Sequence, residues 1–218
     1  MRSIALAVVG CCLAVPAFAA SKEDPLLEET LVAGGAKNEA ELRQLVAQFH
    51  RQVDPIVREL KDQPEAIAAQ LLLRHLHQDY QASRAPLRKY EIDAFSLNRV
   101  LADGHYNCLS ATTLYVLAAR QAGLDVKPEF YDDHARAVLV TRAGKEFQVE
   151  TTGIDGFDLD RWVLHTEGLL QDGAITFEFP RDVTTSELVA QISGEARFYG
   201  VGDGGGAMLA SRFSATLK

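Results

Sequence analysis

Two adjacent segments that alternate apolar and polar residues constrain the fold more than any other feature of the sequence. They are His134–Thr141 and Lys145–Thr151, and only Arg142-Ala143-Gly144 separates them. Alternation with a period of two is typical of half-buried strands, and a three-residue connection with glycine in the left-handed position is a common hairpin loop. The predicted hairpin places its apolar residues on one sheet face, namely Ala135, Ala137, Leu139, Phe147 and Val149.

The same register decides which polar residues are neighbours on the opposite face. Arg136 faces Glu150 directly, and His134 lies diagonally across from Glu150. Diagonal Cβ atoms are about 7 Å apart, which is within reach of a long carboxylate side chain. A loop one residue shorter or longer would separate the histidine from the glutamate. We therefore expect a contact between His134 and Glu150.

A helix rich in alanine and leucine is predicted from Cys108 to Gln121, with Gly123 at its C-terminal cap. Before it, a shorter helix is predicted at Ser96–Leu101, and Asp103-Gly104 ends it. Cys108 therefore stands in the first turn of its helix, where the helix dipole and unpaired backbone N–H groups favour a thiolate. This position makes the thiol a candidate nucleophile.

A thiol nucleophile needs two partners. An imidazole holds the thiolate as an ion pair and later protonates the leaving group, and a third polar group orients the imidazole. We therefore predict a catalytic trio of Cys108, His134 and Glu150. For the oxyanion we expect the backbone N–H of Cys108, with Asn107 or Tyr106 as candidates for a second donor.

The rest of the chain divides into further predicted elements. An N-terminal helical segment occupies residues 20–85, the core 86–180, and a helical and glycine-rich tail 181–218. Pro55 either kinks the helix that contains it or begins a second one. The other expected elements are helices at Glu39–Leu60, Pro64–Tyr80, Asp158–Leu164 and Thr185–Ile192, and strands at Val126–Tyr131 and Ile175–Phe179.

Residues 1–19 have the composition of a secretory signal peptide. Arg2 precedes an apolar run, and Ala17-Phe18-Ala19 has the small-residue pattern of a cleavage site. We expect export to the periplasm or the medium, with a mature chain that begins at Ala20 or Ser21. The alternatives are an uncleaved membrane anchor and a lipid anchor on Cys11, for which the apolar stretch is short.

Charge and cysteine content narrow the functional classes. Without the signal, the chain has 21 basic and 30 acidic residues, which gives a net charge of −9, and it contains no basic tract. Nucleic acids and anionic membrane surfaces are therefore not expected partners. No second apolar span follows the signal. Cys108 is then the last remaining cysteine, and an unpaired thiol in an oxidising compartment is either buried or chemically active.

No cofactor or metal site is predicted. His75 and His77 are two residues apart on a helix, so they point to different sides and are expected to be surface residues. His105 and Cys108 have the spacing of half a zinc site, but no second pair follows them. The glycine-rich segment Gly200–Gly206 lacks the strand, helix and acid of a dinucleotide site, so we expect a flexible joint.

Three short motifs together resemble the transglutaminase-like superfamily. They are similar to its bacterial branch with an Asn-Cys-Leu-Ser nucleophile motif, and they read Gly104-His105-Tyr106-Asn107-Cys108-Leu109-Ser110, Asp133-His134-Ala135 and Val149-Glu150-Thr151-Thr152. The resemblance covers Leu97–Thr152, about a quarter of the chain. It implies an α+β fold with a papain/transglutaminase-like core, in which the nucleophile helix packs on an antiparallel sheet.

The resemblance also implies the roles of the trio. Cys108 would be the nucleophile, His134 the base and Glu150 the orienting acid, at a position where the superfamily more often has aspartate. The expected function is thiol acyl transfer on a peptide or protein amide, including one of the cell envelope, as a peptidase, an amidase or a transamidase. The alternative is an exported binding or scaffold module that keeps the fold without turnover. The oligomeric state stays open.

Overall fold

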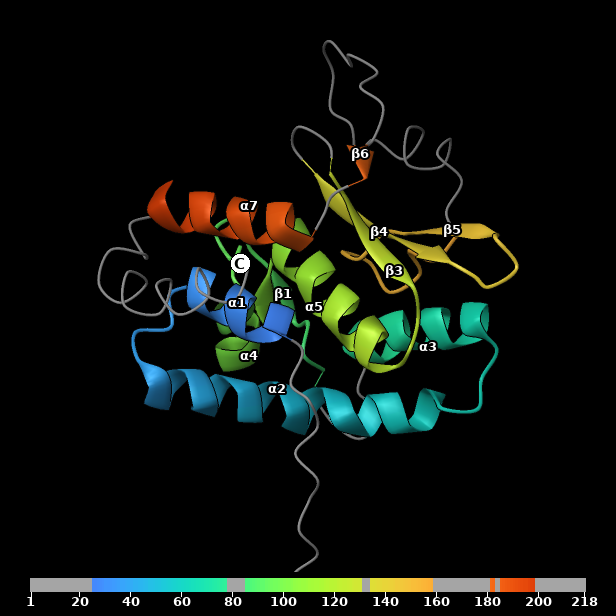
Figure 1. The fold of residues 1–218 in the computed structure, drawn as a ribbon, viewed down its shortest axis with the longest axis horizontal. Coiled ribbons are helices and arrows are strands. Elements are labelled where there is room, and N and C mark those ends of the chain that lie inside the picture. The colour runs from blue at the N-terminus through green and yellow to red at the C-terminus, as the bar shows by residue number, and fades with distance from the viewer. Residues whose placement is uncertain (1–24, 78–84, 131–133, 159–180, 183–184, 199–218) are drawn as a thin grey trace, which may run out of the picture.

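The computed structural model describes residues 25–77, 85–130, 134–158, 181–182 and 185–198, and these form an α+β structure (Figure 1). The helices are α1 (Pro25–Ala33), α2 (Glu39–Leu60), α3 (Glu65–His77), α4 (Leu97–Asp103), α5 (Cys108–Gln121) and α7 (Thr185–Phe198). The strands are β1 (Lys89–Tyr90), β2 (His105–Tyr106), β3 (Val126–Phe130), β4 (Ala135–Val140), β5 (Glu146–Val149) and β6 (Arg181–Asp182).

The main sheet is four-stranded and antiparallel, in the order β5-β4-β3-β6. Its β4–β5 hairpin pairs Ala137 with Val149 and Leu139 with Phe147, which is the predicted register. Gly144 takes the left-handed conformation in the connecting loop, with a φ of 76°. The predicted core face is confirmed as well, because all five of its apolar residues are buried: Ala135, Ala137, Leu139, Phe147 and Val149.

The opposite face of the hairpin is not simply solvated, because Arg136 is only 2% exposed. Its guanidinium donates to Glu129 Oε2 at 2.6 Å and to Gln148 Oε1 at 2.7 Å. A buried guanidinium is tolerated only when an opposite charge and hydrogen bonds satisfy it, and both strands beside β4 supply these partners. Both faces of the hairpin are therefore covered.

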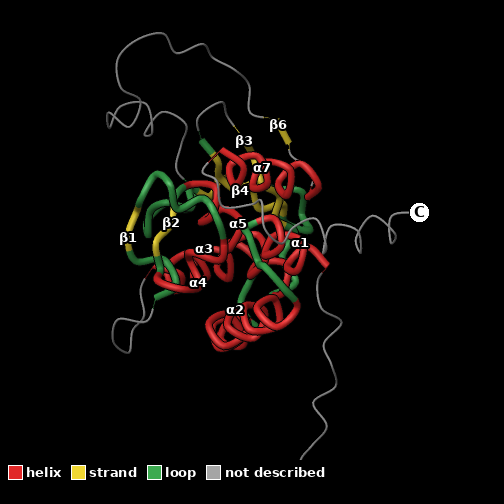
Figure 2. The backbone as a smooth tube through the Cα atoms, turned by 90° about the vertical axis from the view of Figure 1, so that its left-hand side faces the viewer, coloured by secondary structure: helices red, strands yellow, loops and turns green. Residues whose placement is uncertain are grey.

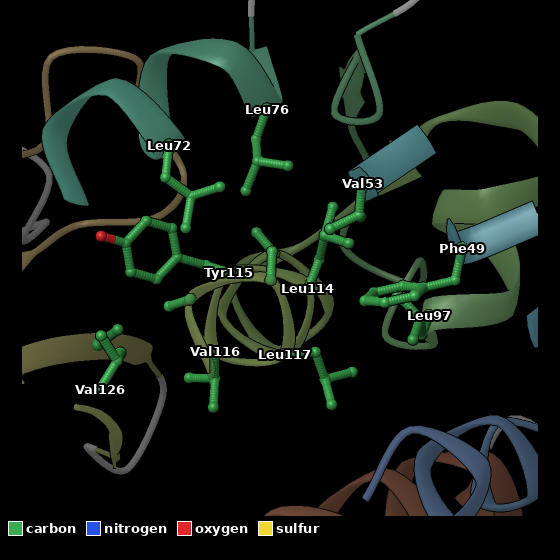
Figure 3. Close-up of a cluster of buried hydrophobic side chains, with 14 of the residues drawn as sticks. Phe49, Val53, Leu72, Leu76, Leu97, Leu114, Tyr115, Val116, Leu117 and Val126 are labelled. Atoms are coloured by element: carbon green, nitrogen blue, oxygen red, sulfur yellow. The ribbon is translucent and has the colours of Figure 1, made fainter. Parts of the chain in front are cut away.

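Helix α5 is the centre of the hydrophobic core (Figure 3). Side chains from α2, α3, α4 and β3 surround it, and its own residues from Leu109 to Ala119 are all buried. Tyr115 is fully buried, and its hydroxyl donates to Ala69 O on α3 at 2.9 Å, so the polar end of the ring is satisfied. The N-terminal helices and α5 thus share one core across the sequence boundary predicted at residue 85.

Both ends of α5 are capped. Asn107 and Ser110 form a capping box, in which the Asn107 side chain accepts from Ser110 N–H and Ser110 Oγ accepts from Asn107 N–H. At the other end Gly123 is left-handed, with a φ of 76°, and Leu124 N–H donates to Ala119 O at 2.9 Å. The predicted limits of this helix, and therefore the position of Cys108 at its start, are confirmed.

Some predicted elements have different limits. Helix α2 continues through Pro55 as a single helix, and α7 extends beyond Ile192 to Phe198. Helix α3 is described as far as His77, and the predicted end at Tyr80 lies outside the described residues. The parallel pair of β1 and β2, away from the four-stranded sheet, had no periodic signal and was not predicted (Figure 2). Asp158 was predicted to be the N-cap of the following helix. It does not have the backbone of an N-cap, because its φ is 55°, whereas an N-cap residue has an extended backbone.

Several predictions fall outside the described residues. They are the signal peptide, the helix after Asp158, the strand Ile175–Phe179 and the glycine-rich segment Gly200–Gly206. Among the residues that the structure does describe, no helix is long and apolar enough to cross a membrane.

Replacing Asn107 by alanine should lower the free energy of unfolding by about 2 kcal/mol, because the change removes a buried cap and a hydrogen bond to Ile92 O. Asn38, the exposed N-cap of α2, is the matched control, and its alanine variant should lose about half as much. Urea unfolding of both variants measures the difference. Equal losses would show that the buried contacts of Asn107 add nothing to its capping role.

Candidate active site

The thiol of Cys108 lies at the first position of α5 and is partly buried. It packs beside an apolar cluster from five parts of the chain, made of Phe95, Leu109, Phe130, Ala135, Leu188 and Ile192. The last two residues belong to α7, which packs beside α1 (Figure 1). The tail of the chain therefore helps to enclose the thiol.

The backbone N–H groups of Cys108 and Leu109 are the first two of α5, and in the described part of the chain neither has an acceptor. The next two N–H groups are satisfied, because Ser110 donates to Asn107 Oδ1 and Ala111 donates to Asn107 O. The free groups stand beside the thiol at the positive end of the helix dipole. This arrangement can hold a negative oxygen.

His134 lies immediately before β4, and its Nε2 is 2.6 Å from Glu150 Oε2. Burial alone would lower the pKa of the imidazole, but hydrogen bonds with Cys108 and Glu150 outweigh it and raise the pKa to about 10. Because Nε2 faces the carboxylate, Nδ1 is the ring nitrogen left to face the sulfur. The imidazole therefore connects the thiol to the carboxylate.

The carboxylate of Glu150 is almost fully enclosed, with 7% of the residue exposed. Burial alone would raise its pKa, but hydrogen bonds from His134 and Thr152 lower it below the ordinary value. Its Oε1 accepts from the Thr152 hydroxyl at 2.6 Å and from the Thr152 N–H at 3.1 Å. Thr152 thus fixes Oε1, and Oε2 contacts His134.

The segment after Glu150 folds back against the end of β5. Glu150 N–H donates to Gly156 O at 2.7 Å, and Asp158 N–H donates to Gln148 O at 2.7 Å. A Cβ atom on Gly156 would lie 2.0 Å from the backbone oxygen of Glu150. Only glycine fits at this position, and it sets the place of the glutamate backbone.

Three other elements anchor the two residues that follow the glutamate. His77 Nε2 on α3 is 2.9 Å from Thr151 O, Thr112 Oγ1 on α5 is 2.8 Å from Thr151 Oγ1, and Tyr106 Oη donates to Thr152 O at 3.2 Å. The rings of His77 and Tyr106 also meet edge to face, with centroids 5.6 Å apart. The carboxylate is therefore held by His134 at its tip and by the anchored residues that follow it in the chain.

His77 corrects one prediction, since it is not a surface residue. Burial lowers the pKa of its imidazole, which therefore favours the neutral form. Its neighbour His75 is also largely covered and lies 3.4 Å from Glu59. The two residues do point to different sides of α3, as predicted, but each side packs against another part of the protein. Helical spacing alone did not show this.

The two predicted candidates for a second oxyanion donor already have other partners. Asn107 Nδ2 donates to Ile92 O at 2.9 Å, and its Oδ1 caps the helix. Tyr106 uses its hydroxyl hydrogen on Thr152 O. Both residues support the site through these contacts, and the Leu109 N–H is a further candidate for the second donor. A capping asparagine must turn toward its own helix, which the sequence motif did not reveal.

Within the described ranges, no three side chains of histidine, cysteine, aspartate or glutamate cluster closely enough to hold a metal ion. No protein-family model matches the chain, and no curated protein matches it. Among solved structures, it is similar to menin in a crystal structure that reveals the binding site for the Mixed Lineage Leukemia (MLL) protein. That likeness has a TM-score of 0.47 and 16% identity, and it spans 77% of this chain and 41% of the menin chain.

Replacing Gly156 by alanine should displace Glu150 and break its contact with His134, because the added Cβ collides with the glutamate backbone. Gly153 is the matched control in the same loop, since a Cβ there meets nothing within 4 Å. The rate of Cys108 alkylation by iodoacetamide at pH 7 reports the effect. We expect at least a tenfold lower rate for Gly156→Ala and no change for Gly153→Ala. Equal rates would refute the positioning role of Gly156.

Proposed function

We propose that this protein is an exported, transglutaminase-like thiol acyl-transfer enzyme that acts on a peptide or protein amide. The observation that carries the proposal is the connected trio, in which His134 contacts both Cys108 and Glu150. The α+β arrangement, with the thiol at the start of a buried helix and the other two groups on an antiparallel hairpin, supports a transglutaminase-like core. The secretory pattern of residues 1–19 supports export.

The first half of the reaction follows from the charges of the trio. With its pKa raised to about 10, His134 is protonated at neutral pH and stabilises a thiolate on Cys108. The sulfur attacks the amide carbonyl carbon, and the carbonyl electron pair moves to the oxygen. The N–H groups of Cys108 and Leu109 stabilise that oxyanion. Collapse of the intermediate breaks the C–N bond, and the leaving amine takes its proton from His134.

The second half regenerates the enzyme from a thioester on Cys108. His134, now neutral, removes a proton from water, whose oxygen attacks the thioester carbonyl and expels the thiolate. The product is a carboxylic acid, as in a peptidase or amidase. An amine in place of water gives a new amide, as in a transamidase. Glu150 carries its charge throughout and stabilises the protonated imidazole each time it forms.

Glutamate in place of aspartate suits the geometry of this site. The Glu150 side chain starts one residue beyond β5, and its carboxylate must reach both His134 and Thr152. A side chain shorter by one methylene cannot keep both contacts without moving the backbone. Gly156 and Thr151 hold that backbone in place. The longer acid is therefore the one that fits.

The test uses p-nitrophenyl acetate, which acylates a reactive thiolate and releases coloured p-nitrophenolate. We expect a stoichiometric burst from the full chain, with the acetyl group on Cys108 in the intact-mass spectrum. Cys108→Ser and His134→Ala should remove the burst with little change in thermal stability, because the two groups act as one unit. Glu150→Gln should lose less than these variants, whereas Glu150→Asp should react about 100-fold more slowly than wild type.

The outcomes separate the proposal from its alternative. A folded wild-type protein that shows neither a burst nor Cys108-dependent turnover of the ester would support a binding or scaffold module without turnover. A Glu150→Asp variant as reactive as wild type would show that Glu150 is not the orienting acid. Circular dichroism of every variant establishes that the loss is chemical and not a loss of fold.

A further inference from the structure

Two large apolar side chains that are exposed belong to a segment bonded to the residues next to Cys108. In the described ranges three such side chains stand out, and two of them, Tyr90 and Ile92, lie in one short segment. Tyr90 is 51% exposed and Ile92 is 78% exposed, whereas the third, Ile67, is 45% exposed and lies near the start of α3. A single exposed isoleucine would carry no meaning, but two exposed apolar residues two positions apart, in a segment bonded to the neighbours of Cys108, mark a candidate apolar surface.

The segment with these two residues is fixed to the start of α5. Ile92 O accepts from Asn107 Nδ2 at 2.9 Å, and Ala94 O accepts from Ser110 Oγ at 2.6 Å. Asn107 directly precedes the nucleophile, and Ser110 follows it by two positions. The backbone at Ile92 is therefore as firmly placed relative to Cys108 as the helix cap itself. Its side chain is nevertheless left to solvent.

Tyr90 is placed by its partner strand. The parallel pairing of β1 and β2 sets Tyr90 opposite Tyr106, and the two rings meet edge to face with centroids 5.8 Å apart. Partial burial raises the pKa of the Tyr90 phenol, and the negative charges of Cys108 and Glu150 raise it further. The phenol is thus within electrostatic reach of the reacting groups.

Several charges next to this surface are paired with one another. Lys89 Nζ lies 2.6 Å from Glu91 Oε1, and the other oxygen of Glu91 lies 2.9 Å from His105 Nδ1 and 3.4 Å from an Arg99 nitrogen. These paired groups present no strong single charge to an ionic substrate side chain. Arg88 and Asp93, which flank the segment, are exposed. The exposed groups of Tyr90 and Ile92 are the distinctive feature, and they favour an apolar contact.

On the basis of the proposed function, we propose that Tyr90 and Ile92 bind an apolar side chain of the substrate beside the bond that Cys108 attacks. The preferred substrate is then a peptide with an aromatic or large aliphatic residue at that bond. Two side chains fit one substrate residue, whereas a stable protein interface needs about 1,000 Å² of buried area. The place of the pair next to the nucleophile also favours a substrate over a docking partner.

The experiment compares the acylation of Cys108 by p-nitrophenyl esters of N-acetylglycine and N-acetylphenylalanine, with p-nitrophenyl acetate as the reference ester. Wild type should prefer the phenylalanine ester over the glycine ester by about tenfold or more in the second-order rate constant. Ile92→Ser and Tyr90→Ser should each reduce this ratio several-fold, and Ile92→Leu should keep it. Ile67→Ser is the matched control, since it removes an exposed apolar side chain from α3, and its ratio should equal that of wild type.

Two failures are distinguishable. If wild type acylates with p-nitrophenyl acetate but shows no preference for phenylalanine, or if the serine variants keep the preference, the apolar surface is not a substrate site while thiol chemistry stands. If wild type gives no acylation with any ester, the proposed function fails, and the substrate proposal fails with it.

Discussion

The contact between His134 and Glu150 is the interaction on which the other features of this site depend. The two side chains approach to 2.6 Å in a place where Glu150 is 7% exposed. In such surroundings an unpaired carboxylate would be costly, and a paired one exerts a strong field on its partner. Burial lowers the pKa of the imidazole, but its hydrogen bonds with Cys108 and Glu150 outweigh this effect and keep it protonated at neutral pH. In the proposed reaction, this buried ion pair supports the nucleophile at the start of α5.

Such a pair is stable only if the protein holds the carboxylate in one position. The two residues that follow Glu150 are anchored by α3, β2 and α5, and Gly156 allows the loop to close against its backbone. These anchors come from elements that also build the hydrophobic core around α5. The packing of the core and the geometry of the trio are therefore parts of one arrangement. A substitution in the part of the core that packs against α3 should therefore displace the carboxylate of Glu150.

How much of this could be predicted from the sequence depends on whether each feature has a local signal. The hairpin register followed from strict alternation and a three-residue loop with Gly144, so the contact of His134 with Glu150 could be derived before the structure. The start of α5 followed from its cap residues. The roles of His77, Gly156 and the Tyr90–Ile92 segment could not be derived, because each depends on contacts between residues far apart or on a two-residue strand without periodicity.

The most direct test of the account is an NMR titration of the His134 ring in the intact protein. The imidazole should remain protonated through neutral pH and titrate near a pKa of about 10, because Cys108 and Glu150 both stabilise its charge. In a Glu150→Gln variant the pKa should fall clearly below the wild-type value. A wild-type imidazole that titrates near the ordinary value of 6.5, and does not respond to Glu150→Gln, would contradict the account.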